Sequence, residues 1–279
     1  HLALFDLNED KVKADVIDLK DALPNLGHHV EITYNDYSEL ADADVIVSTL
    51  GNIKLQDNPD NDRFAELPYT SAQVKVVASR IKASGFKGIL VVVTNPVDVI
   101  TMIYQAETGL PKERVIGTGT LLDSARMKHA VAESLNLDPR SVSGYNLGEH
   151  GNSQFTAWST VRVLDKPIDK LAAEKGLYLA ELDKQAREGG FAVFHGKKYT
   201  SYGIATAAVR LVETIFADAK TVLPVSNYLT EFGLYMSMPA VIGAKGVLAR
   251  VPLSLTASEK EKLRISANYI KTKYAESKD

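Results

Sequence analysis

The first part of the chain alternates short apolar runs with helical stretches. Runs rich in β-branched residues predict strands, and apolar residues spaced three and four apart predict helices between them. The expected strands are residues 2–5, 30–34, 44–50, 89–93 and 115–116, and the expected helices are residues 9–23, 64–81 and 99–106. Continuous apolar strands between helices are typical of a parallel sheet that is buried on both faces. We therefore expect a doubly wound α/β domain of the Rossmann type, which binds ligands at the carboxyl ends of its strands.

After about Gly119 the pattern becomes a mixture of helices and strands. The expected helices are residues 121–135, 170–187 and 199–217, and the expected extended segments are residues 141–146, 154–163, 221–225 and 240–255. The last of these segments is broken by an expected turn at Gly243-Ala244-Lys245-Gly246. Thr256 and Glu259 have the spacing of a capping box, which predicts the start of a last helix. We therefore predict a dinucleotide-binding domain over residues 1–118 and a mixed α+β substrate and catalytic domain over residues 119–279.

Composition narrows the classes of function. The 279 residues are 45% hydrophobic and can bury a sizeable core. The sequence has no cysteine, which excludes disulfides, Cys-ligated zinc and a thiol nucleophile. The net charge is −3, no basic block suggests nucleic acid, and no apolar run approaches the ~20 residues that span a bilayer. We expect a cytoplasmic protein with a small-molecule substrate and with no metal, nucleic-acid or membrane partner.

The chain begins at His1 inside an apolar run that ends at Asp6. An acidic residue at the end of the second strand of a dinucleotide fold binds the adenosine ribose, and its charge favours NAD over NADP. The alternative is that Asp6 caps the helix that starts near Asn8. The glycine-rich turn that binds the pyrophosphate should precede such an acid by about 20 residues. We therefore expect the first βα unit to lie ahead of His1, which leaves the dinucleotide domain incomplete at its N-terminus.

Four side chains are candidates for acid–base chemistry and anion binding. His150 lies between glycines in Gly148-Glu149-His150-Gly151, and we expect these glycines to leave the imidazole uncrowded. Asp123 and Arg126 are three residues apart on an expected helix, so the alternative is an ordinary helical ion pair. Arg63 follows the polar loop 52–62 and is a candidate for a lid that closes over the substrate, or it is an exposed arginine in the first turn of a helix.

Further motifs accompany these residues in a fixed order. Asn95 follows an apolar strand and is expected at the carboxyl edge of the sheet, although Asn95-Pro96 also fits a plain turn. The complete ordered set resembles the L-lactate/malate dehydrogenase family over essentially the whole chain. Its segments are Leu4-Phe5-Asp6, Thr94-Asn95-Pro96-Val97-Asp98, Val115-Ile116-Gly117-Thr118-Gly119, Leu122-Asp123-Ser124-Ala125-Arg126, Gly148-Glu149-His150-Gly151 and Tyr199-Thr200-Ser201-Tyr202.

The resemblance implies a role for each candidate in hydride transfer between NAD and a 2-hydroxy acid. It implies that His150 exchanges the proton with the substrate and that Asp123 orients it. It implies that Arg126 grips the substrate carboxylate and that Arg63 polarises the ketone. The remaining implied contacts are substrate contacts of Asn95 and Thr200 and cofactor contacts of Asp6, Gly51, Asn95 and Ile204.

The lid indicates the substrate. Malate dehydrogenases of this family carry a further arginine in the lid for the second carboxylate, and residues 52–62 contain none. Residues 51–55 and 62–67 resemble the L-2-hydroxyisocaproate dehydrogenase branch of the family, and the lid is long. We therefore expect 2-oxo acids with a branched or medium-length apolar side chain, with L-lactate dehydrogenase activity as the alternative.

The resemblance also bears on regulation and assembly. Many bacterial lactate dehydrogenases bind a sugar bisphosphate through a basic residue and a histidine. Here the matching positions are Lys128 and Ser143, so we expect no such activation. The family forms dimers and tetramers, and we expect a homo-oligomer.

Two readings from other classes stay open. One is an NAD-dependent glycosidase, which uses a metal held partly by cysteine and is disfavoured by the absence of cysteine. The other is a non-catalytic binding protein or an inactive fragment.

Overall fold

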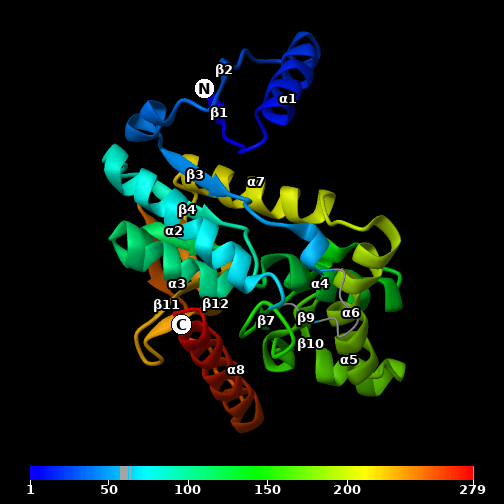
Figure 1. Ribbon diagram of the computed structural model, residues 1–279. Coiled ribbons are helices and arrows are strands. Elements are labelled where there is room, and N and C mark those ends of the chain that lie inside the picture. Colours follow the sequence, from blue (N-terminus) through cyan, green and yellow to red (C-terminus); the bar gives the residue numbers. More distant parts are fainter. Residues whose placement is uncertain (57–61, 63, 279) are drawn as a thin grey trace.

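The computed structural model describes residues 1–56, 62 and 64–278, and its centre is one six-stranded sheet (Figure 1). The strand order is β13-β12-β11-β5-β4-β3, in which β3, β4 and β5 are parallel and the other three strands are antiparallel. The bounds are β3 (Val45–Ser48), β4 (Ile89–Val92), β5 (Val115–Gly117), β11 (Thr221–Leu229), β12 (Leu234–Gly243) and β13 (Gly246–Arg250). This arrangement confirms the expected α/β fold.

Helices cover both faces of this sheet, because alternate residues of β4 are apolar on one face and on the other. Leu90 and Val92 pack into the core formed with α2 (Leu67–Ser84), α3 (Val97–Thr108) and α8 (Ala257–Glu276). Ile89 and Val91 pack on the opposite face, against α7 (Tyr202–Phe216). All four side chains of β4 are buried, so the continuous apolar run is what a doubly covered parallel strand requires.

The N-terminal elements form a separate layer. β1 (Leu2–Leu4) pairs in parallel with β2 (Ile32–Tyr34). Helix α1 (Glu9–Ala22) follows β1 and has Asn8 as its N-cap. These elements lie beyond the β3 side of the main sheet (Figure 1).

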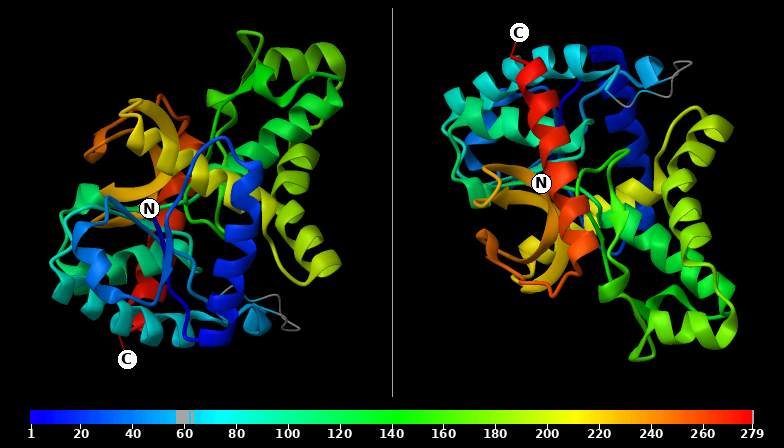
Figure 2. Two further views of the ribbon diagram at one scale, coloured as in Figure 1. Left: turned by 90° about the horizontal axis from the view of Figure 1, so that it is seen from above. Right: turned by 90° about the horizontal axis from the view of Figure 1, so that it is seen from below.

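A third group of elements lies to one side of the main sheet (Figure 2). It consists of α4 (Leu121–Ser134), α5 (Ile168–Lys175) and α6 (Leu179–Lys197), which share a hydrophobic core. A small sheet of order β10-β9-β6 closes this core, and a hairpin of β7 and β8 lies next to it in the chain. The bounds of these strands are β6 (Val142–Ser143), β7 (Asn146–Leu147), β8 (Phe155–Thr156), β9 (Arg162–Val163) and β10 (Lys166–Pro167).

Two expectations about elements are wrong. The single helix expected over residues 170–187 is two helices, because Gly176 adopts φ +67° and ends α5 in the left-handed conformation that glycine favours. The strand run expected over residues 240–255 begins earlier, at Leu234, and ends at Arg250, whereas the turn predicted within it at residues 243–246 is confirmed. Pro252 lies just beyond that end and has no N–H to donate to a strand ladder.

The sheet also joins the two parts of the chain that the sequence separates at residues 118 and 119. Gly117 of β5 pairs with Ser226 of β11, so strands from the second part extend the sheet of the first. The boundary itself stays a prediction. No helix in the described part of the chain combines the length and apolar character needed to cross a membrane.

The start of α8 is held by the predicted capping box. Thr256 accepts a hydrogen bond from the backbone N–H of Glu259, whose carboxylate accepts one from the backbone N–H of Thr256. The same carboxylate accepts hydrogen bonds from the N–H and the hydroxyl of Ser159, at 3.0 and 2.7 Å. Burial alone would raise the pKa of Glu259, but these hydrogen bonds outweigh it and leave the pKa below its usual value.

We predict that Glu259→Ala lowers the free energy of unfolding by about 2–3 kcal/mol, because it removes the charged acceptor that the N–H and hydroxyl of Ser159 and the N–H of Thr256 share. Since the pKa of Glu259 is lowered in the folded state, its contribution is present above the ordinary value of 4.5 and is lost as the pH falls through the folded pKa. Urea unfolding at pH 7 and pH 4 measures this. The matched control is exposed Glu261→Ala on the same helix, and an equal loss in both variants would contradict the prediction.

Candidate active site

Three of the predicted residues meet around one buried carboxylate. Asp123 Oδ2 lies 2.5 Å from His150 Nδ1, and Asp123 Oδ1 accepts a hydrogen bond of 2.9 Å from Arg126 Nη1. Asp123 is fully buried, whereas the side chains of His150 and Arg126 keep 16% and 18% of their surface exposed. A carboxylate can only accept hydrogen bonds, so Nδ1 of His150 carries a proton and Nε2 is left to face the cavity.

His150 lies on the loop between β7 and β8, and its backbone is fixed from the core. The backbone N–H of His150 donates to Asp98 Oδ2 at 2.8 Å, and Ser226 donates its hydroxyl to Asp98 Oδ1 at 2.5 Å. Just before it, Gly148 exchanges two backbone hydrogen bonds with Ser237 of β12. The loop is therefore tied to α3 and to two strands of the main sheet.

Asp98 is a site residue to which the sequence analysis gave no role. Burial raises its pKa to about 7, although the hydrogen bonds from Ser226 and from the backbone of His150 oppose that shift. The nearby carboxylate of Glu149 raises the pKa further. The available signal was its position, three residues after Asn95 in the first turn of a helix that leaves the sheet at its carboxyl edge.

The expectation about the glycines around His150 needs a correction. A Cβ on Gly151 would lie 1.9 Å from Oε1 of Glu149, so Gly151 makes room for this glutamate and not for the imidazole. Glu149 turns into the protein, where its Oε2 accepts hydrogen bonds from the N–H and the hydroxyl of Ser153. Its backbone N–H donates to Ser266 of α8. Glu149 therefore anchors the loop, and Gly151 leaves the space that its side chain needs.

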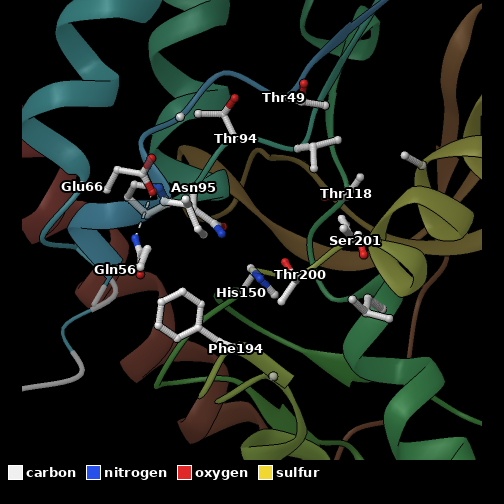
Figure 3. A pocket seen from close by; sticks show the side chains of 18 of the residues that line it. Thr49, Gln56, Glu66, Thr94, Asn95, Thr118, His150, Phe194, Thr200 and Ser201 are labelled. Carbon is white, nitrogen blue, oxygen red and sulfur yellow. Dashed lines mark hydrogen bonds between the residues drawn. The ribbon is translucent and has the colours of Figure 1, made fainter. Parts of the chain in front are cut away.

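Four other predicted residues line one cavity of about 520 Å³ together with His150 and Arg126. Gly51 and Asn95 border it from the carboxyl ends of β3 and β4, and Thr200 and Ile204 border it from the start of α7. Asn95, His150 and Thr200 are seen around this cavity in Figure 3.

Two predicted residues are not placed there. Arg63 lies outside the described residues. Asp6 is absent from the described lining of the cavity and lies in the loop between β1 and α1. Its Oδ1 accepts a hydrogen bond from the backbone of Asn8, and Asn8 itself caps α1. The alternative that Asp6 caps this helix is therefore wrong in its residue: Asn8 is the cap, and Asp6 binds the backbone of Asn8.

Glu66 is a second residue to which the sequence analysis gave no role. It is buried beside the cavity, where it accepts hydrogen bonds from the backbone of Asn52 and from the side chain of Gln56 (Figure 3). A Cβ on Gly51 would lie 2.7 Å from Glu66 Oε1, so a larger residue at this position would displace the carboxylate from its hydrogen bond with Asn52. The base of the polar loop is thereby fastened to the start of α2.

The cavity suits the nicotinamide end of the expected cofactor. The carboxyl ends of β3, β4 and β5 contribute Thr49, Thr94 and Thr118, and α7 contributes the apolar side chains of Ile204 and Ala208. An apolar wall with polar groups at the strand ends is where a doubly wound sheet binds a nicotinamide ring. Among the described residues, no cluster of three histidine, cysteine or acidic side chains has the arrangement of a metal site.

Comparisons with known proteins agree with this geometry. Residues 1–117 match the family profile of the lactate/malate dehydrogenase NAD binding domain, and residues 120–279 match that of the alpha/beta C-terminal domain. L-lactate dehydrogenase 1 of Bifidobacterium longum is 36% identical over 279 residues, which cover 97% of this chain and 87% of that protein. L-lactate dehydrogenase of Halalkalibacterium halodurans is 38% identical over 275 residues, with the same coverage.

Solved structures give the same result. A lactate dehydrogenase from a Medee basin deep-sea metagenome library superposes with a TM-score of 0.92 at 32% identity, over 99% of this chain and 90% of that one. The ligand-bound minor L-lactate dehydrogenase of Enterococcus mundtii gives 0.92 at 33% identity, over 98% and 88%. Fold and matches together define an NAD-dependent dehydrogenase. The chain belongs to the lactate/malate dehydrogenase family.

We predict that Asp98→Asn flattens the dependence of stability on pH. Because the folded state keeps the proton up to about pH 7 while the unfolded chain releases it near pH 4, wild-type stability should fall between these values with a slope of up to about 1.4 kcal/mol per pH unit. Asparagine can still accept from the backbone of His150 but does not titrate. Urea unfolding from pH 5 to pH 8 tests this, and parallel curves for the two proteins would refute it.

Proposed function

We propose that this protein interconverts L-2-hydroxy acids and 2-oxo acids that have a branched or medium-length apolar side chain, such as 2-oxoisocaproate. The observation that supports this most directly is the group of His150, Asp123 and Arg126 at one wall of the cavity. Bound NAD supplies the hydride acceptor or donor. The residues of the chain supply the proton, the anion anchor and the walls.

His150 is the proton carrier in this proposal. In oxidation its Nε2 takes the proton of the substrate hydroxyl, and in reduction it returns a proton to the oxygen of the ketone. Asp123 accepts from Nδ1 and so fixes the tautomer that these steps require. Because Asp98 holds the backbone of the same residue, both ends of His150 are positioned before substrate binds.

Arg126 is the anchor for the substrate carboxylate. Asp123 occupies Nη1, and the remaining N–H groups of the guanidinium are available for an anion. A planar fork binds a carboxylate through two parallel hydrogen bonds, which fixes the substrate relative to His150. Asn95 and Thr200 are the proposed polar contacts of the substrate, with Asn95 also contacting the cofactor. Arg63 stays the predicted residue that polarises the ketone.

The composition of the cavity wall supports an apolar substrate side chain. Among the described lining residues, Arg126 is the one lysine or arginine. Phe191 and Phe194 of α6 provide aromatic surface, and Glu66 adds a negative charge near the base of the lid. A second substrate carboxylate would meet that charge, so dicarboxylic acids such as oxaloacetate are the least favoured substrates.

The second candidate is L-lactate dehydrogenase activity. It is favoured by the curated relatives, which are named L-lactate dehydrogenases. Both candidates share the same site and chemistry, and they differ in the size of the substrate side chain.

Three further expectations from the sequence stay proposals. We propose that the protein forms a homo-oligomer and that Asp6 binds the adenosine ribose of NAD. We also propose that the boundary between the two domains lies near residue 118.

A substrate panel tests the proposed specificity. We expect kcat/KM for 2-oxoisocaproate to exceed that for pyruvate by about tenfold or more, since each additional buried apolar group contributes to transition-state binding. Oxaloacetate should give the lowest value. Steady-state kinetics with NADH measures all three acids. Pyruvate in first place would support the lactate alternative, and oxaloacetate in first place would overturn the argument from the lid and Glu66.

The role of Arg126 is tested by Arg126→Lys. A lysine keeps the charge but cannot form a bidentate fork, so KM for the 2-oxo acid should rise about 10- to 100-fold. The matched control is Arg140→Lys, which alters a second arginine–aspartate pair that is exposed on the surface. An unchanged KM in Arg126→Lys, or an equal rise in both variants, would remove Arg126 from the substrate site.

A further inference from the structure

Two adjacent glycines in the middle of α6 face the guanidinium of Arg126. A Cβ on Gly190 would lie 3.2 Å from Arg126 Nη1 and 3.5 Å from Cζ and Nη2. A Cβ on Gly189 would lie 3.5 Å from Arg126 Cδ. Helices α4 and α6 pack against each other, so this contact joins the helix of Arg126 to a helix more than fifty residues later in the chain.

The position of these glycines is unfavourable for the helix itself. Glycine is among the poorest helix formers, because it loses the most backbone freedom on folding. Neither residue has the positive φ that would require glycine. Local helix geometry therefore does not explain Gly190, whereas the arginine on the other side of the gap does.

Arg126 is confined between two groups. Its Nη1 donates to Asp123 on one side, and the same nitrogen approaches the backbone of α6 at Gly190 on the other. A guanidinium that yields to an added methyl group shifts relative to Asp123, which is also the partner of His150. A displacement of a few tenths of an ångström would therefore redirect the fork.

We propose that Gly190 is a positioning residue for substrate binding: it leaves a side-chain-free seat on α6 in which the Arg126 guanidinium lies at the angle that receives the substrate carboxylate. The inference rests on the proposed function, because it presumes a carboxylate substrate. It assigns to α6 a part in affinity for every 2-oxo acid, whatever the length of its side chain.

The chain offers a graded set of alanine variants within one helix. Gly190→Ala crowds the guanidinium, Gly189→Ala reaches Arg126 Cδ at an ordinary contact distance, and Gly196→Ala meets nothing within 4 Å. All three substitutions replace glycine by a better helix former, so none should lower Tm, and Gly196→Ala should raise it by about 1–3 °C. Gly196→Ala is the matched control for the effect on the helix alone.

Steady-state kinetics of the three variants with pyruvate and 2-oxoisocaproate tests the proposal. We expect Gly190→Ala to raise KM about five- to tenfold for both acids by a similar factor, with kcat changed less than twofold, because a misdirected fork weakens a contact that both substrates share. Gly189→Ala should have a smaller effect and Gly196→Ala none. Calorimetric titration with oxamate, a 2-oxo acid isostere that is not reduced, should show the same loss of affinity.

Three results would overturn the proposal. One is an unchanged KM in Gly190→Ala. Another is a rise for 2-oxoisocaproate alone, which would make Gly190 a determinant of side-chain size. A third is a fall in Tm of several degrees, which would show general packing damage. Crystal structures of the wild type and Gly190→Ala separate this inference from the proposed function, because they report the displacement of Arg126 even if the wild type reduces neither acid.

Discussion

The site depends on the burial of a single carboxylate, that of Asp123. A charged group without solvent must be satisfied by the protein, and here one oxygen pairs with His150 and the other with Arg126. The proton carrier and the proposed anion anchor therefore share one reference point in α4. Two further features of the site act on the partners of this carboxylate: Asp98 fixes the backbone of His150, and the glycines of α6 leave space for Arg126.

Much of the fold could be predicted from the sequence, because hydrophobic periodicity reports burial. The run at residues 89–93 predicted a strand covered on both faces, and the Thr256–Glu259 spacing predicted the cap of α8. The prediction failed where distant partners decide the outcome. β12 begins at Leu234, before the expected strand, because its register is set by residue-by-residue pairing with β11. No local pattern contains that pairing.

The candidate site divides in the same way. His150, Asp123 and Arg126 could be singled out because their residue types and order resemble a known family, and the structure brings them together. Asp98 and Glu66 could not be assigned, since both are buried and their partners are not part of a local pattern. Asp98 meets Ser226 and His150, which are far away in the chain, and Glu66 meets the loop that precedes it. Gly190 lies in an ordinary charged helix, and its significance depends on a side chain of another helix. The sequence shows which side chains are present, whereas the tertiary contacts of these side chains determine their roles.

The pairing of Gly117 with Ser226 has a consequence for the resistance of the molecule to aggregation. The edge of β5 is covered by a strand that arrives more than a hundred residues later, and that strand continues into β12 and the bridge that holds the His150 loop. If β11 and β12 separated from β5, the molecule would expose the apolar edge of β5, and an unpaired strand edge is a template for association with other chains. The ladder that aligns the catalytic loop therefore also protects the protein from aggregation.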